Sequence, residues 1–155
     1  SEVYPRTAVR STTLFARQRL AGGFALPVKT IREQITGSID VILIGTGSEV
    51  QLALQARDQL ATQGIGARVV SAPCLEWFAE QTSEYRDSVL PASVRARVAV
   101  EAGSTSLWHS YVGDAGRVVG LDHFGASADF KTLFREFGIT TEAVIAAAQA
   151  SLASI

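Results

Sequence analysis

The arrangement of apolar residues is most distinctive at residues 41–44, where Val, Ile, Leu and Ile follow one another without a polar interruption. A continuous apolar run of this length is typical of a strand that is buried on both faces of a sheet. The turn Gly45-Thr46-Gly47-Ser48 then leads into a segment with helical spacing, whose apolar stripe is formed by Val50, Ala53, Leu54 and Ala61. We therefore predict half of a βαβ unit and an α/β fold.

The rest of the chain continues with short elements and short connections. Further strands are predicted at residues 67–70, 97–100 and 117–121, and packing helices at residues 75–80, 85–89 and 107–112. Upstream, residues 12–16 fit a short strand, whereas the pattern of residues 25–35 is ambiguous. No internal repeat or low-complexity tract is visible, so we expect one compact core.

Two helices are predicted to close the domain. The first has Ser127 as its N-cap and Gly138 just past its end, and its aromatic face should be buried; this face consists of Phe130, Leu133, Phe134 and Phe137. The second starts at Thr140 or Thr141, and its apolar stripe consists of Val144, Ala148 and Leu152.

The glycine turn at residues 45–48 also tests a dinucleotide-binding function, because such proteins seat a pyrophosphate where a glycine turn opens a helix. The third position of a G-x-G-x-x-G motif is Val50 here, and no acidic residue ends the next predicted strand. Glu49 in the first helical turn would repel a phosphate. A helix start with Ser48 as N-cap and Gln51 completing a capping box is therefore the favoured interpretation.

Composition narrows the class of protein further. The 155 residues are 47% hydrophobic and 19% charged, and no apolar run approaches the roughly 20 residues that span a bilayer. A single cysteine, Cys74, excludes an internal disulfide framework, and a reducing, cytoplasmic setting is the simplest expectation. The net charge of −1 hides a basic start, since residues 1–39 hold six Lys or Arg against two Glu.

The candidates for chemistry do not form a recognisable constellation. They are His109, His123, Glu101, Asp114 and Asp122, and none has the spacing of a metal site. A structural role is favoured for His109, which follows Trp108 in a predicted packing helix. Glu101 and His123 lie just past the ends of predicted strands, where open α/β sheets place ligands, so they form a possible ligand site. No basic stripe with interleaved aromatics supports nucleic-acid binding.

Three segments together resemble the C-terminal domain of the transketolases. They are residues 42–50, residues 98–103 with Trp108, and residues 123–128, and the resemblance covers about residues 40–152. It implies a three-layer, doubly wound, mostly parallel sheet of about five strands. Residues 12–18 resemble the end of the preceding, pyrimidine-binding domain of the same family. On this resemblance, residues 1–39 are the tail of that domain plus a linker, and residues 40–155 are the transketolase C-terminal domain.

The resemblance also implies an activity for the whole enzyme. Transketolases use thiamine diphosphate and magnesium to move a two-carbon ketol unit from a ketose phosphate to an aldose phosphate. The family's glutamate, metal-binding Asp and Asn, and histidines lie in the upstream domains. This chain contains no Asn, and Gly113-Asp114-Ala115 is not the family's diphosphate motif. We therefore expect the chain alone to bind no cofactor and to be catalytically inactive.

Partners and one site residue follow from the same resemblance. The expected partners are the upstream domains of the parent enzyme, which would be a cytoplasmic homodimer without nucleic-acid or membrane contacts. Arg17 matches the family's arginine that contacts the substrate phosphate, and a guanidinium fork suits that task.

Two other interpretations of the sequence remain open. The first is a free-standing Rossmann-like module that binds a small anionic ligand at the strand ends near Gly45, Gly103 and Gly125. The second is the β subunit of a 2-oxo acid dehydrogenase, which shares this domain type but matches residues 123–128 less well.

Overall fold

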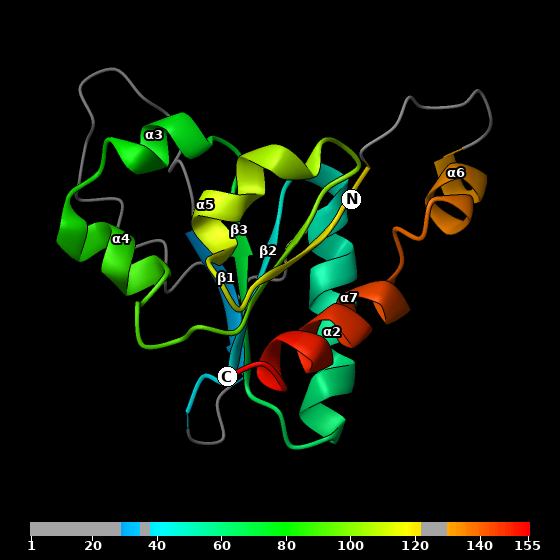
Figure 1. The fold of residues 1–155 in the computed structure, drawn as a ribbon, viewed down its shortest axis with the longest axis horizontal. Coiled ribbons are helices and arrows are strands. Elements are labelled where there is room, and N and C mark those ends of the chain that lie inside the picture. The colour runs from blue at the N-terminus through cyan, green and yellow to red at the C-terminus, as the bar shows by residue number, and fades with distance from the viewer. Residues whose placement is uncertain (1–28, 35–37, 122–129) are drawn as a thin grey trace.

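A five-stranded sheet forms the centre of the computed structural model, which describes residues 29–34, 38–121 and 130–155 (Figure 1). The strand order is β1-β3-β2-β4-β5, and the strands are β1 Lys29–Gln34, β2 Val41–Gly45, β3 Ala67–Ser71, β4 Arg97–Val100 and β5 Arg117–Val119. Strands β2 to β5 are parallel, whereas β1 pairs antiparallel with β3. This confirms the predicted mostly parallel sheet. The strand predicted at residues 12–16 lies outside the described residues.

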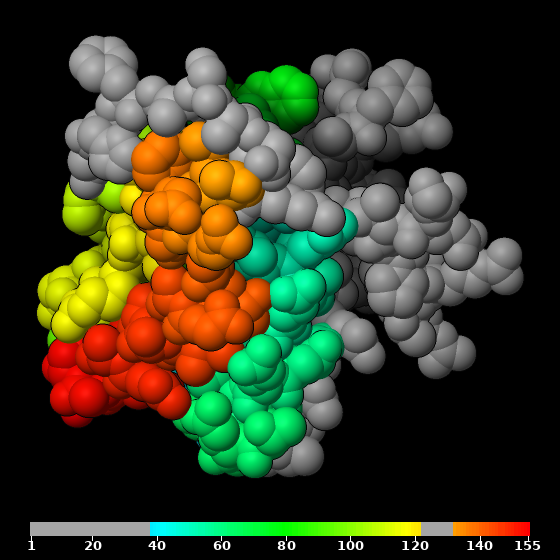
Figure 2. All heavy atoms as spheres, turned by 90° about the vertical axis from the view of Figure 1, so that its right-hand side faces the viewer, coloured from blue at the N-terminus to red at the C-terminus, as the bar shows by residue number. Residues whose placement is uncertain are grey.

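Helices cover both faces of the sheet. Their bounds are η2 Gly47–Glu49, α2 Val50–Thr62, α3 Leu75–Ala79, α4 Ser83–Val89, η3 Thr105–Trp108, α5 His109–Val112, α6 Phe130–Glu136 and α7 Thr141–Leu152, where η marks a 3-10 helix. Helices α2 and α7 lie side by side on one face, as Figure 2 shows, and α3, α4 and α5 cover the other. The packing helix predicted at residues 107–112 is thus divided into η3 and α5.

Strand β2 contributes to two separate cores. Val41 and Leu43 pack in the core under α2 and α7, while Ile42 and Ile44 pack in the core under α3, α4 and α5. All four side chains are at most 1% exposed. Because successive side chains of a strand point to opposite faces, the apolar run requires a helical layer on each side. The predicted three layers are therefore confirmed.

Helix α2 differs from its prediction in two ways. The expected capping box at Ser48 is wrong, because η2 precedes the helix and neither element has a side-chain cap. The amide of Glu49 instead donates to the carbonyl of Thr46, which satisfies a donor at this end. The predicted stripe is partly wrong too, since Leu54 and Ala61 are only half-buried while Arg57 is 1% exposed.

The end of α6 agrees with its prediction, but the burial of its aromatic face does not. Gly138 has a φ of +69°, and the amides of Gly138 and Ile139 donate to the carbonyls of Arg135 and Phe134, which is a Schellman motif. Leu133, Phe134 and Phe137, however, are only half-buried because α6 packs at the edge of the α2 and α7 core. Ser127 and Phe130 lie outside the described side chains.

Helix α7 starts as predicted, and its buried stripe is shifted at its end. The side chain of Thr140 accepts a hydrogen bond from the amide of Ala143 and caps the helix. Leu152 is half-buried, and the neighbouring Ser151 is fully buried in its place. The Ser151 hydroxyl donates to the Ala115 carbonyl at 2.7 Å and accepts from the Arg97 amide at 3.2 Å, so it ties α7 to β4 and to the segment before β5.

Arg97, at the amino-terminal end of β4, connects this strand to neighbouring segments through side-chain hydrogen bonds. Its guanidinium is half-buried and donates to four backbone carbonyls, at Val94, Tyr111, Leu90 and Pro91. Burial lowers the pKa of this guanidinium, and the nearby Asp87 carboxylate raises it. One side chain thus satisfies carbonyls from the end of α5 and from the loop between α4 and β4.

Substitution Arg97→Met is expected to destabilise the domain. The four carbonyls would lose a charged donor, and the free energy of unfolding should fall by about 2 to 4 kcal/mol. Urea denaturation followed by circular dichroism measures this change. The matched control is Arg95→Met, which removes an exposed ion pair with Asp114 and should stay within about 0.5 kcal/mol. Equal effects of the two substitutions would contradict the role given to Arg97.

A second prediction concerns the buried hydroxyl of α7. Substitution Ser151→Ala leaves the Arg97 amide and the Ala115 carbonyl without this partner, and should lower the free energy of unfolding by about 2 kcal/mol. Ser154→Ala is the control, because its hydroxyl lies at 3.5 Å from the same carbonyl and the residue is exposed. The urea midpoint of Ser151→Ala should therefore be lower than that of Ser154→Ala. Equal midpoints would contradict the role of the Ser151 hydroxyl in joining α7 to β4.

Candidate functional site at the strand ends

The connections of the sheet create one position where a ligand is expected. From β2 the chain crosses to β3 on one side and then returns to β4 on the other side of β2. In open α/β sheets, ligands bind at such a switch point, outside the carboxyl ends of the two strands. The residues that follow these ends are the turn at residues 45–49 and the segment at residues 101–104.

The turn after β2 is shaped for close packing of α2. A Cβ at Gly45 would lie 3.0 Å from the Cα and 3.1 Å from the amide nitrogen of Val50, so a larger residue would push the helix away. Gly47 has a φ of +54°, and Glu49 is 7% exposed at the beginning of the helix. A buried carboxylate at this end disfavours a bound anion. The two glycines therefore allow helix α2 to pack close to the end of strand β2.

The carboxylate of Glu101 is engaged by a neighbouring side chain. It accepts a hydrogen bond from the indole Nε1 of Trp108, which is 1% exposed. A buried indole N–H needs an acceptor, so Glu101 satisfies the one polar atom of the largest buried side chain in this core. The segment is also fixed by its backbone, because the Gly103 carbonyl accepts from the Leu121 amide at 2.8 Å.

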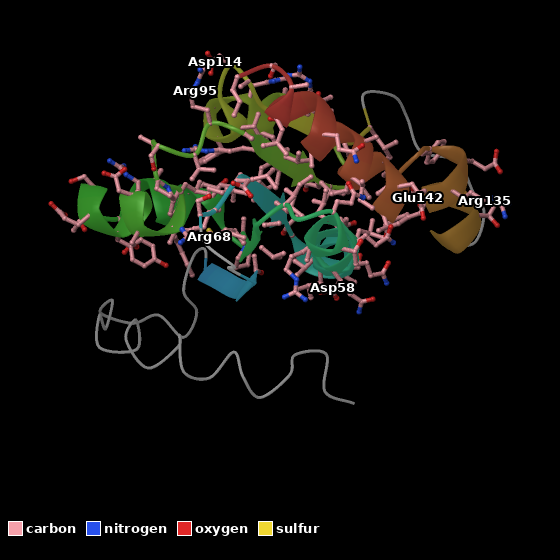
Figure 3. The ribbon with its side chains drawn as sticks, turned by 90° about the horizontal axis from the view of Figure 1, so that it is seen from below. Asp58, Arg68, Arg95, Asp114, Arg135 and Glu142 are labelled. Atoms are coloured by element: carbon pink, nitrogen blue, oxygen red, sulfur yellow. The ribbon has the colours of Figure 1, made fainter. Side chains whose placement is uncertain are left out.

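Neither of the other candidates that the structure describes, His109 and Asp114, joins Glu101 in a catalytic group. His109 is exposed although Trp108 beside it is buried, so the predicted packing role does not extend to its ring. Asp114 lies in an exposed ion pair with Arg95, whose hydrogen bond holds the pKa of this carboxyl below its usual value. Both residues are labelled in Figure 3. Arg17, Asp122 and His123 lie outside the described residues, so a ligand site at Glu101 and His123 stays a prediction.

Two features of the structure were not predicted from the sequence. The pairing of Glu101 with Trp108 spans seven residues across a strand end, a spacing that no periodic pattern reports. The burial of Arg57 had a signal, because this residue lies four positions after Ala53 and seven after Val50 on the same helical stripe.

The residues at the strand ends do not fit thiamine diphosphate and its metal ion. Glu49 lies where a phosphate would meet the helix, and the Glu101 carboxylate already accepts the indole hydrogen bond. No group of three or more His, Cys, Asp or Glu side chains that could hold a metal ion occurs in the described part of the chain. None of the helices described here is long and apolar enough to cross a membrane.

Comparison with known proteins identifies the family. A family model described as the transketolase-like TK C-terminal domain matches residues 28–140, which is most of the chain. The chain belongs to the transketolase family. Its sequence is 64% identical over 110 residues to the transketolase of Mycobacterium leprae, and this match covers 71% of the chain and 16% of the relative. The chloroplastic transketolase of Zea mays is 50% identical over 121 residues, covering 77% and 18%.

Solved transketolases have the same fold. The transketolase from Leishmania mexicana superimposes with a TM-score of 0.75 at 34% identity, covering 83% of this chain and 18% of that one. A transketolase from Pichia stipitis in complex with sedoheptulose-7-phosphate gives a TM-score of 0.74 at 38% identity, with the same coverage. The chain therefore spans about a sixth of the length of the transketolases that it matches. The family match and β1 both begin upstream of residue 40.

The pairing of Glu101 with Trp108 gives a testable expectation. Substitution Glu101→Leu leaves the buried indole N–H without an acceptor and should lower the free energy of unfolding by about 1 to 3 kcal/mol. Glu101→Gln keeps a carbonyl acceptor and should cost less. Both are measured by urea denaturation with tryptophan fluorescence, in a Trp77→Phe background that leaves Trp108 as the only reporter. If Glu101→Leu and Glu101→Gln lower the free energy of unfolding equally, the hydrogen bond to the indole is not the contribution of Glu101 to stability.

Proposed function

We propose that this chain works as the C-terminal part of a longer transketolase, which transfers a two-carbon ketol unit between ketose and aldose phosphates. The observation that carries the proposal is the 64% identity with mycobacterial transketolases over most of the chain. A sugar phosphate is bound by the related protein from Pichia stipitis, which supports this class of substrate.

The division of labour within that enzyme follows from the strand ends. At the strand ends, the described residues pack against one another and provide no binding site for a diphosphate. We therefore assign thiamine diphosphate, which supplies the carbanion chemistry when bound, and its magnesium to the preceding part of the enzyme. This chain would serve as a support domain without cofactor-binding capacity of its own. A homodimeric, cytoplasmic enzyme of the pentose phosphate pathway is the corresponding proposal for the whole.

The amino-terminal residues have a separate place in the proposal. Residues 1–39 would form the tail of the preceding pyrimidine-binding domain and the linker, with β1 as the part of the linker that pairs with β3. Arg17 would contact the phosphate of the sugar substrate, because its guanidinium offers parallel N–H donors to two phosphate oxygens.

A ketol-transfer assay tests the assignment. The 155-residue chain with thiamine diphosphate, magnesium, a ketose phosphate and an aldose phosphate should show no turnover above background. The full-length protein that contains this domain should show turnover under the same conditions. Turnover by the isolated chain would refute the support role, and an inactive full-length protein would refute the transketolase assignment.

The role proposed for Arg17 predicts a defect in substrate binding. In the full-length enzyme, Arg17→Ala should raise the KM for the sugar phosphate at least about tenfold, since a charge-assisted contact is lost, while kcat changes less. The matched control is Arg19→Ala, two residues further along. Equal KM values for the two variants would contradict the contact.

A further inference from the structure

We draw no further inference here: the strongest candidate, the acidic surface along α3 and α4 around the exposed side chain of Trp77, is a cluster of solvated carboxylates beside an unpartnered helix face, and nothing in the described part of the structure shows what covers it.

Discussion

The burial of β2 on both faces is the constraint on which the rest of this structure depends. Its four apolar side chains alternate between two cores, so neither face of the sheet can be left to water. Helices must therefore cross on both sides, and β2 must lie between β3 and β4. The switch point at the ends of β2 and β4 is a direct consequence of this arrangement.

At that switch point, residues in positions that bind ligands in other α/β proteins serve the packing of this domain. Gly45 allows the backbone of α2 to approach the strand, and the Glu101 carboxylate completes the hydrogen bonding of the Trp108 indole. Both features increase the stability of the two cores, and both occupy positions where a ligand would need free donors. This is consistent with a transketolase domain whose cofactor belongs to a different part of the enzyme.

The sequence predicted the strands β2 to β4 within a residue and the end of α6 at Gly138, because apolar periodicity and a positive φ leave local signals. It failed where the outcome depends on neighbours that are distant in sequence. Leu54 and Ala61 were predicted to lie on the buried stripe of α2, yet α7 and the sheet leave both side chains half-buried. Ser151 is buried for a similar reason, since its two partners lie 36 and 54 residues away.

At the candidate site, too, the sequence did not reveal which residues would become neighbours in the fold. Glu101 could be selected by its position after a strand, but its partner Trp108 became evident only from the packing of η3 against the sheet. Arg57 was not selected at all, because a charged residue on an apolar stripe is ordinarily interpreted as the exposed border of that stripe. Its burial depends on how the sheet and its neighbouring elements cover this side of α2, which the sequence of the helix alone does not report.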